Sequence, residues 1–280
     1  MGIRLANLKG RASLLVGDRA LDLERRSRGH FSADPMQAIS RFDELAEWAD
    51  GIDVEDAGET LDVDALGPCV PCPQKVFGIG LNYRDHAKEA GLELPEQPMV
   101  FTKFPSCLVG PRSEVVLTSN RVDWEVELVA VIGRAGTGIP EADAGRFIAG
   151  YCIGQDISDR RMQFADRPPQ FSLGKSADTF GPIGPAVVSL DSFEDPNDLT
   201  LSCDVNGERM QDGRTRDMIF AVPELVAYLS RHCTLLPGDL IFTGTPAGVG
   251  FARERYLRQD DEITSTIEPI GSLVNRCVGA

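Results

Sequence analysis

The sequence predicts a mostly β protein with some α structure, in which a β-rich core follows a small N-terminal α+β lobe. Three observations support this prediction: many short apolar runs are separated by Gly, Pro and Asn turns, few helical stretches lie between them, and residues 67–73 form a proline-rich join. A regular strand–helix alternation, which would indicate a doubly wound parallel sheet, is missing. We therefore expect a lobe at residues 1–70 and a catalytic core at residues 71–280.

The N-terminal lobe is predicted to begin with short strands at residues 3–8, 12–16 and 19–23, because turn-forming residues separate these apolar runs. One helix is expected to follow, with Asp34 as its N-cap, Pro35 in the first turn and apolar residues at helical spacing through Ala49. The lobe contains no catalytic constellation, so we expect it to have a scaffolding or dimer-related role.

The core is predicted to contain one helix at residues 223–230 and a hairpin turn at Asn206-Gly207. Its predicted strands are residues 76–80, 115–117, 125–132, 149–156, 186–190, 199–205, 239–243 and 262–267.

Composition narrows the class of partner and the compartment. The 280-residue chain carries a net charge of -15, which argues against nucleic acid or an anionic membrane surface as partner. No run is long enough to span a bilayer and the first residues show no signal pattern, so a cytoplasmic protein is expected. Seven cysteines, an odd number, disfavour a disulfide framework. The Cys69/Cys72 pair has no second pair to complete a zinc site, so a functional role for it is disfavoured.

The most informative segment is the acidic strand at residues 122–132. Side chains alternate along a strand, so Asp123, Glu125 and Glu127 are expected on one face. A second predicted strand ends in another carboxylate, Asp156. Such an oxygen-only set suits Mg²⁺, Mn²⁺ or Ca²⁺ rather than zinc. The alternative is a solvent-facing strand whose acidic residues bind nothing.

Residues 80–91 are predicted to form a loop and a short helix, with Asn82 as N-cap and Gly91 at the C-terminal end. His86 and Glu89 are three residues apart, so their side chains can meet on such a helix. A carboxylate orients an imidazole and raises its basicity, which suits a general base that activates water. An exposed helix on which the two residues meet by accident is the alternative.

Two further segments carry chemical groups. Lys175 lies among glycines and apolar residues, an unusual place for a solvated charge, and could stabilise a developing enolate. Residues 236–250 are predicted to be a strand that opens into a Gly/Thr loop. There, backbone N–H groups with the hydroxyls of Thr243 and Thr245 could hold a carboxylate, although an ordinary glycine-rich turn is the alternative.

Taken together, six segments resemble the fumarylacetoacetate hydrolase family in their order and content. They are GLNYRDH (80–86), DWEVEL (123–128), GYCIGQDIS (150–158), GKSADTFGPIGP (174–185), VNGERMQ (205–211) and PGDLIFTGTPAGVG (237–250). The resemblance covers residues 75–278 and implies a mixed β-sandwich roll that forms a homodimer. It also implies a metal site, with Mg²⁺ as the expected ion and Mn²⁺ or Ca²⁺ as possible ones.

The resemblance assigns roles to individual residues, as follows: metal ligands Glu125, Glu127 and Asp156; catalytic residues His86, Glu89 and Lys175; substrate-binding residues Arg160, Gln163, Gly244 and Thr245. One departure concerns the position after Arg160, where the family usually has Asp and this chain has Arg161. This reversed charge is expected to affect the orientation of Arg160 and the substrate preference.

The implied activity is metal-dependent hydrolysis of a C–C bond in a small 2,4-diketo acid, giving pyruvate and a carboxylic acid. Oxaloacetate decarboxylation and 2-keto acid tautomerisation or isomerisation are alternatives on the same fold. A non-catalytic protein that binds a small acid is the rival from another class. Candidates for the pocket that accepts the acyl group are Phe164, Phe171 and residues 253–256.

Overall fold

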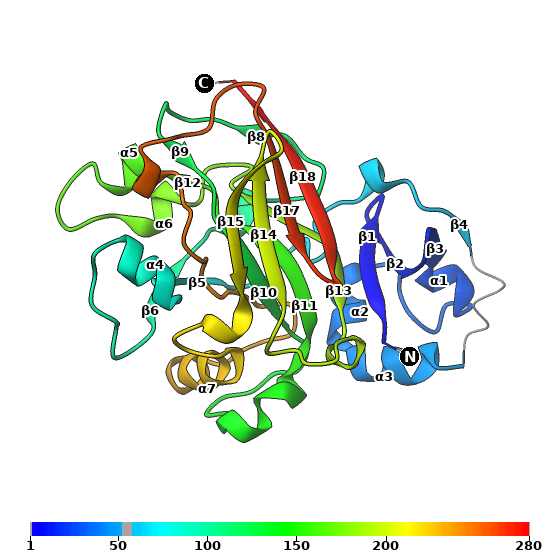
Figure 1. The fold of residues 1–280 in the computed structure, drawn as a ribbon. Coiled ribbons are helices and arrows are strands. Elements are labelled where there is room, and N and C mark those ends of the chain that lie inside the picture. Colours follow the sequence, from blue (N-terminus) through cyan, green and yellow to red (C-terminus); the bar gives the residue numbers. More distant parts are fainter. Residues whose placement is uncertain (1, 52–57, 280) are drawn as a thin grey trace.

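The computed structural model describes residues 2–51 and 58–279, which form two β-sheets that face each other, with short helices at their ends (Figure 1). In the larger sheet the strands follow the order β4-β3-β2-β1-β13-β11-β10-β16-β5-β6, and β7 pairs with β13. Its strands are β1 Arg4–Leu8, β2 Arg11–Val16, β3 Arg19–Asp22, β4 Glu59–Thr60, β5 Val76–Gly80, β6 Met99–Thr102, β7 Leu108–Val109, β10 Val126–Ile132, β11 Ile148–Gln155, β13 Gly181–Val188 and β16 Leu240–Phe242.

The second sheet has the order β15-β14-β17-β18-β8, and a separate two-stranded ladder joins β9 to β12. These strands are β8 Val115–Val116, β9 Val122–Asp123, β12 Ser158–Asp159, β14 Thr200–Val205, β15 Glu208–Arg214, β17 Glu262–Ile267 and β18 Gly271–Val278. Most pairs are antiparallel, whereas β16–β5, β13–β7 and β18–β8 are parallel. The predicted mostly β, mixed sandwich fold is therefore confirmed.

Burial explains why the central strands are apolar at nearly every position. Every residue of β10 and β11 is buried, because these strands lie between the second sheet and the elements on the other face. Strand β17 alternates buried and less buried residues, as expected for a sheet with one wetter face. The site residues at the ends of β10 and β11 are therefore carried by strands that are buried from water along their whole length.

The N-terminal strands lie close to their predicted positions, and they continue the larger sheet. Strand β1 pairs with β13 in the register Arg4↔Val188 and Leu5↔Val187. Figure 1 labels β1, in blue, next to β13. The division of the chain at residue 70 stays a prediction. The helices of this region are α1 Leu23–Arg26, α2 Pro35–Ser40 and α3 Phe42–Ala49.

The prediction of a single helix after Asp34 is wrong in one respect, because two helices, α2 and α3, form in its place. Asp34 does cap α2, by accepting a hydrogen bond from the N–H of Met36 at 2.9 Å. Arg41 then leaves the helical conformation (φ −118°, ψ 31°) and separates α2 from α3. The apolar spacing still places Ile39 and Leu45 in the core on the two sides of the break.

The core helices are α4 Arg84–Glu89, α5 Arg160–Gln163, α6 Phe171–Gly174 and α7 Val222–His232. Short 3₁₀ helices connect other elements at Val63–Ala65, Pro105–Cys107, Glu141–Phe147, Leu190–Ser192, Thr215–Asp217 and Phe251–Arg253. The Asn206-Gly207 hairpin joins β14 to β15, with positive φ at both residues. Among residues 2–51 and 58–279, no helix is long and apolar enough to cross a membrane.

Among the described strands that were not predicted, β6 and β18 are the two that are longer than two residues. In β18 the buried face carries Asn275 between Leu273 and Cys277, and the Asn275 amide donates to the carbonyl of Ser113 at 2.8 Å. A buried polar residue of this kind interrupts the apolar alternation that marks a strand in sequence.

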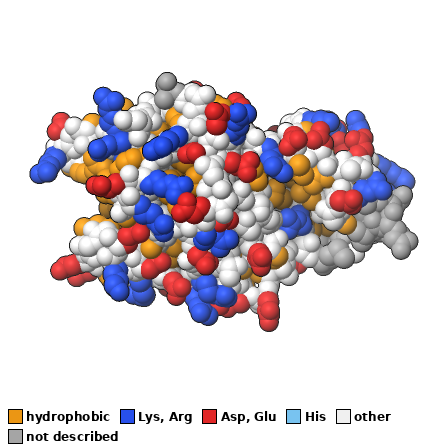
Figure 2. Space-filling model, turned by 45° about the horizontal axis from the view of Figure 1, so that its top comes forward, with side chains coloured by type: hydrophobic (Ala, Val, Ile, Leu, Met, Phe, Trp, Pro, Cys, Tyr) orange, Lys and Arg blue, Asp and Glu red, His pale blue; other side chains and the backbone are white. Residues whose placement is uncertain are grey.

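Charged side chains of both signs are interspersed on the face drawn in Figure 2, with hydrophobic side chains exposed between them. No single-sign basic surface dominates this view, in line with the net charge of -15. The cysteines are all free; Cys69 is buried and Cys72 is exposed.

Candidate metal centre and active site

Three buried carboxylates converge where β10 and β11 meet. Glu125 precedes β10, Glu127 lies within it, and Asp156 directly follows β11. The N–H of Asp156 donates to the carbonyl of Glu125 at 2.9 Å, which fixes the two strand ends side by side. One oxygen from each of the three carboxylates lies within 4.8 Å of the others. The alternative of solvent-facing acidic residues is excluded, because all three residues are buried.

Asp123 does not join this cluster, although alternation along one strand predicted that it would share its face. The chain leaves the strand at Trp124 and Glu125, between β9 and β10. The Asp123 carboxylate instead accepts hydrogen bonds from the backbone N–H groups of Gly250 (2.6 Å) and Phe251 (2.9 Å). It therefore anchors the end of the Gly/Thr loop.

Lys175 lies at the floor of the site and bridges two of the three carboxylates. Its Nζ donates to Glu125 Oε2 at 2.8 Å, to Asp156 Oδ2 at 2.7 Å and to Ser158 Oγ at 2.7 Å. Burial alone would lower the pKa of Lys175, but the charges of Asp156 and Glu125 raise it, so the ammonium stays charged. The unusual position of Lys175 among glycines and apolar residues in the sequence is thus explained by the burial of its charge.

A second buried lysine, Lys103, was not predicted as part of the site. Its Nζ donates to Asp156 Oδ1 at 2.7 Å, to the carbonyl of Phe180 at 3.1 Å and to the carbonyl of Lys175. The side chain is completely buried. The available signal was its position just after an apolar strand and before Phe104-Pro105, where a solvated lysine is uncommon.

Arg160 forms the other side of the floor. Its guanidinium donates to Asp123 Oδ2 at 2.8 Å, to Gln163 Oε1 at 2.8 Å and to Glu125. Asp159 caps the short helix that carries Arg160 and Gln163. The neighbouring Arg161 side chain is exposed. Buried partners hold Arg160 in place, and the effect of Arg161 on Arg160 and on substrate preference stays a prediction.

The electrostatics of the carboxylates differ according to their partners. Burial would raise the pKa of Glu125, but Lys175 and then Arg160 outweigh it and lower the pKa to about 2. Glu127 has the opposite shift: burial, followed by the charges of Asp156 and Glu125, raises its pKa well above the ordinary value. Glu127 accepts a hydrogen bond from the N–H of Gly244 at 2.8 Å, which only partly offsets these effects.

This charge balance is a test of whether a divalent ion fits the site. The buried groups are the carboxylates of Asp123, Glu125, Glu127 and Asp156 and the cations of Lys103, Arg160 and Lys175. Asp123, Glu125 and Asp156 are hydrogen-bonded to these cations, whereas Glu127 accepts from the N–H of Gly244 and is bonded to none of the three cations. The raised pKa of Glu127 means that this carboxyl holds a proton readily, and a bound cation would replace that proton. Hard divalent cations bind carboxylate oxygens of this kind. The residues therefore fit such an ion, which Glu125, Glu127 and Asp156 would hold.

The helix α4 brings His86 and Glu89 together, with His86 Nδ1 3.3 Å from Glu89 Oε2. The Glu89 carboxylate also accepts from the N–H of Gly248 at 3.0 and 3.1 Å, which docks α4 onto the Gly/Thr loop. Burial opposes the ionisation of Glu89, but the bonds from His86 and Gly248 prevail and lower its pKa. Gly91, with φ of +66°, ends the helix region as predicted.

Asn82 was predicted as the N-cap of this helix, and that prediction is wrong. Tyr83 occupies the cap position, without a side-chain hydrogen bond. The Asn82 amide is buried and donates to the carbonyls of Phe220 (3.0 Å) and Thr243 (2.7 Å), while its oxygen accepts from the N–H of Phe220. Asn82 therefore joins α4 to the start of the loop at residues 243–250.

The hydroxyls of that loop are already occupied in the structure. Thr243 Oγ1 donates to the carbonyl of Leu128, and Thr245 Oγ1 donates to the carbonyl of Val126, each at 2.8 Å. Backbone N–H groups of the loop do hold carboxylates, but these carboxylates are side chains of the protein itself, those of Glu127, Glu89 and Asp123. Gly244 thus positions Glu127, and Thr245 contributes to the lining of the cavity next to it.

A cavity of about 410 Å³ opens above the carboxylates. Its charged and polar lining residues are His86, Glu125, Glu127, Arg160, Gln163, Lys175 and Thr245. The rest of its lining is almost entirely apolar and includes Phe164 and Phe171, as proposed for the acyl pocket. Residues 253–256 do not line it, because they lie beyond the 3₁₀ turn, and Glu254 to Tyr256 border a different cavity.

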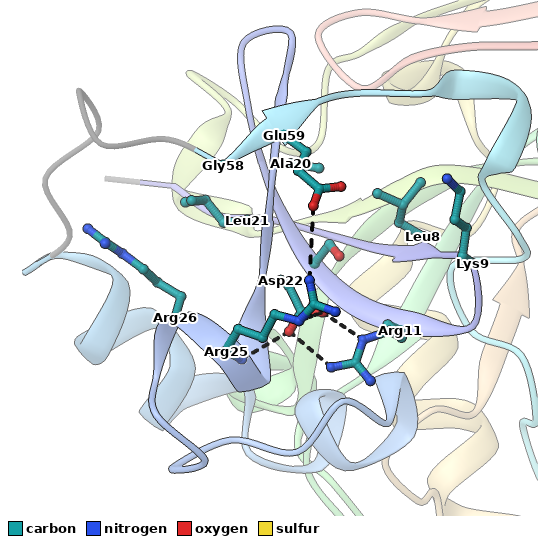
Figure 3. Close-up of a pocket in the computed structure, with 11 residues that line it drawn as sticks. Leu8, Lys9, Arg11, Ala20, Leu21, Asp22, Arg25, Arg26, Gly58 and Glu59 are labelled. Carbon is teal, nitrogen blue, oxygen red and sulfur yellow. Dashed lines mark hydrogen bonds and ion pairs between the residues drawn. The ribbon is translucent and has the colours of Figure 1, made fainter.

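Another cavity of about 410 Å³ lies in the N-terminal region, between β2, β3 and α1 (Figure 3). Its Arg11 donates to Asp22 at 2.6 Å and to Glu24 at 2.8 Å, and Arg25 is 3.8 Å from Asp22. Two of the basic side chains drawn there, Arg11 and Arg25, thus have carboxylate partners, and the three converging carboxylates lie at the other cavity. We therefore regard the cavity above the three carboxylates as the candidate active site.

The fold and the site together define a β-sandwich protein whose buried carboxylates, fit to hold a divalent metal, lie at the floor of a cavity that opens to the surface. Residues 75–278 match the family model for the fumarylacetoacetate (FAA) hydrolase C-terminal region. The chain belongs to the fumarylacetoacetate hydrolase family, whose members are hydrolases and isomerases.

Named relatives place it within that family. The human mitochondrial oxaloacetate tautomerase FAHD2A is 45% identical over 221 residues, which are 78% of this chain and 70% of the relative. A Mycobacterium smegmatis structure with the provisional name HpcE has a TM-score of 0.92 and 45% identity, with 99% of each chain covered. Fumarylpyruvate hydrolase from Pseudomonas aeruginosa, solved with Mn²⁺ and pyruvate, has a TM-score of 0.68 and 32% identity, covering 74% of this chain and 91% of that one.

Proposed function

We propose that the protein is a divalent-metal-dependent hydrolase that cleaves a C–C bond in a small 2,4-diketo acid to give pyruvate and a carboxylic acid. The observation that carries the proposal is the His86–Glu89 pair, 3.3 Å apart, with His86 lining the same cavity as Glu125 and Glu127. Hydrolysis needs an activated water at this position, and an imidazole oriented by a carboxylate suits that task.

The metal completes the proposed site. We propose Mg²⁺ as the resident ion, with Mn²⁺ or Ca²⁺ as possible substitutes, held by Glu125, Glu127 and Asp156. The convergence of three buried carboxylates and the Mn²⁺ in the related fumarylpyruvate hydrolase support this assignment. When bound, a divalent ion supplies Lewis-acid polarisation of the substrate's 2-oxo and carboxylate oxygens.

The residues of the chain would act in sequence. His86 takes a proton from water, and the resulting hydroxide attacks the 4-carbonyl carbon. The C3–C4 bond then breaks, the electron pair stays on C3 as the pyruvate enolate, and the acyl group leaves as a carboxylic acid. The ammonium of Lys175 stabilises the enolate by its charge. His86 returns the proton to C3, so that water and diketo acid become pyruvate and acid in balance.

The remaining residues of the proposed site position the substrate or a metal ligand. Arg160 and Gln163 line the cavity and are bonded to each other at 2.8 Å, so they can orient the substrate as a unit. Thr245 borders the carboxylate end of the cavity, and Gly244 holds Glu127 in place.

A second candidate is oxaloacetate tautomerisation, which the name of the 45% identical human relative favours. That reaction needs only a proton shuttle between carbon and oxygen, and His86 could carry the proton. Decarboxylation of oxaloacetate likewise needs no activated water. We favour hydrolysis because Glu89, which orients His86, is also held by Gly248 beside the cavity.

The test uses protein stripped with EDTA and then resupplied with Mg²⁺ or Mn²⁺. Acetylpyruvate, longer acylpyruvates and oxaloacetate are offered, and pyruvate, free acids, carbon dioxide and the enol-to-keto ratio are measured. Metal-dependent release of pyruvate with an acid supports the proposal. Turnover of oxaloacetate alone would replace it with the tautomerase or decarboxylase reading, and no turnover of any compound would favour a binding protein.

The variant His86→Ala should lower kcat for hydrolysis by about 10²–10⁴-fold, the usual contribution of general acid–base catalysis. His30→Ala is a matched control, because His30 also contacts a glutamate, Glu44, at 2.9 Å, but is exposed and outside the site. Equal activity of the two variants would remove the dyad from the mechanism.

We further propose that the protein is cytoplasmic and homodimeric. Seven free cysteines, most of them buried, suit a reducing compartment. Light scattering coupled to size exclusion measures the oligomeric state, and a monomer at micromolar concentration would contradict the dimer.

A further inference from the structure

The walls of the active-site cavity contain two pairs of aromatic rings from distant segments. Phe164 stacks on Phe251, with ring centroids 5.2 Å apart and planes inclined by 30°. Phe101 of β6 lies against Phe171 of α6, with centroids 5.8 Å apart and planes inclined by 34°. All four rings line the same cavity. Four chain segments therefore meet to form apolar walls.

One ring of each aromatic pair lies close to a cation at the floor of the cavity. The Nζ of Lys175 lies 5.2 Å from the ring centroid of Phe101, and the guanidinium carbon of Arg160 lies 5.8 Å from the centroid of Phe251. A ligand whose charged head lies at the carboxylate cluster would therefore extend along aromatic surface as it leaves the floor.

The outer part of the cavity stays apolar and open. Phe164 and Phe251 are 45% and 46% exposed, and Met99 and Leu92 are 42% and 58% exposed. Large apolar side chains that gather around a cavity mouth indicate a surface that ligands bury.

The cations that line the cavity are committed at its floor. Among the described lining residues, the permanent cations are Arg160 and Lys175, and both are hydrogen-bonded to the buried carboxylates. A second carboxylate at the far end of a ligand would therefore lie against apolar side chains without a cationic partner, and the water that it gave up to those side chains would not be compensated, which is costly.

We infer that this site selects 2-oxo monocarboxylic acids whose distal substituent is apolar, an aryl group or an alkyl chain, and that it discriminates against dicarboxylic acids. The inference rests on the proposed function, since it places the 2-oxo acid head at the carboxylate cluster. For the proposed hydrolysis, the preferred substrates are acylpyruvates with aromatic or medium-length acyl groups. Burial of each added methylene is worth about a fourfold gain in binding.

Binding and turnover are measured separately on Mn²⁺-loaded protein. The binding probes are non-hydrolysable: 4-phenyl-2-oxobutanoate, 5-methyl-2-oxohexanoate and its diacid counterpart 2-oxoglutarate, titrated by calorimetry. We expect the phenyl compound to bind at least about 30-fold more tightly than 2-oxobutanoate. The branched monoacid should bind at least about 10-fold more tightly than 2-oxoglutarate. Equal or tighter binding of 2-oxoglutarate would overturn the inference.

Turnover then distinguishes the two proposals. Benzoylpyruvate should be hydrolysed with a higher kcat/KM than acetylpyruvate, and fumarylpyruvate, a diacid, with a lower one. If the apolar probes bind as expected but no diketo acid is hydrolysed, the proposed hydrolysis fails and the inferred selectivity stands. If fumarylpyruvate is the best substrate, hydrolysis stands and the inferred selectivity is refuted.

A charge introduced at the mouth gives a second test. Phe164→Arg should reverse the preference, by about 10-fold or more toward 2-oxoglutarate, because it supplies the missing cation. Phe104→Arg is the matched control, since Phe104 is 46% exposed but does not line the cavity. An unchanged preference in the folded Phe164→Arg protein would also refute the inference.

Discussion

Replacing Lys103 with methionine tests whether the buried cations hold the metal centre together. Methionine keeps most of the apolar stem and removes the ammonium. In the wild type this ammonium is fully buried and donates to Asp156 at 2.7 Å and to the carbonyl of Phe180 at 3.1 Å. The variant leaves the Asp156 carboxylate with Lys175 as its remaining lysine partner and deprives two carbonyls of their donor.

The expected destabilisation follows from this geometry. Breaking a buried ion pair by removing one partner costs about 3–5 kcal/mol. The unfolding entropy of a 280-residue chain is about 0.6 kcal/mol per kelvin, from about 2.1 cal/mol/K per residue. A loss of about 4 kcal/mol therefore lowers Tm by about 7 °C. Lys9→Met is the control, because the Lys9–Asp62 pair is exposed and 3.9 Å long, and it should shift Tm by less than about 2 °C.

The same variant makes a prediction about the metal. Loss of one cation increases the negative charge around Glu125, Glu127 and Asp156, so Mn²⁺ should raise Tm more in Lys103→Met than in the wild type. Scanning calorimetry with EDTA and with saturating Mn²⁺ measures both quantities. A Tm in EDTA within about 2 °C of the wild type would refute the energetic reasoning. An equal Mn²⁺-induced shift would refute the electrostatic reasoning.

Glu127→Gln should weaken Mn²⁺ binding by at least about 100-fold while stabilising the metal-free protein, because burial raises the pKa of Glu127; calorimetric titration that finds the wild-type affinity would contradict its role as a ligand. The lowered pKa of Glu89 means that its stabilising contribution is present above its ordinary value of 4.5 and is lost as the pH falls through the lowered one. The stability difference between wild type and Glu89→Gln should therefore shrink in acid, and a difference that grows below about pH 4 would reverse this sign. Gly244→Ala should cost more than about 2 kcal/mol in urea unfolding, because φ is +95° and the new Cβ would lie 2.7 Å from that of Asn82. Gly207→Ala, with φ of +76° and nothing within 4 Å, should cost only about 1 kcal/mol; equal costs would mean that strain, rather than the clash, dominates.

The parts of the site that sequence could predict are those that depend on local spacing. Glu125 and Glu127 are two residues apart and point to one cluster, and His86 and Glu89 are one helical turn apart and meet. Such relations need only the geometry of a strand or a helix. The mostly β class also follows from local patterns of apolar runs and turns.

The parts that sequence missed depend on contacts between distant segments. Asn82 resembles a helix cap in sequence, but its amide bonds to residues 138 and 161 positions away. Lys103 has no neighbouring motif, and its role appears only when Asp156 is placed beside it. Likewise, the spacing of Asp123 predicts a shared face with Glu125, whereas its bonds to Gly250 and Phe251 draw it elsewhere.

The continuation of the larger sheet from β13 into β1 limits where this chain can be cut. A fragment that starts at residue 71 would lose the partner of β13 at Val187 and Val188 and the buried side chains of Leu5 and Ala6, which belong to the same apolar clusters as residues of β13. Unpaired strand edges of this kind recruit other chains. The catalytic segment on its own is therefore expected to self-associate in an irregular way, and residues 2–8 protect the molecule against aggregation although they lie far from its chemistry.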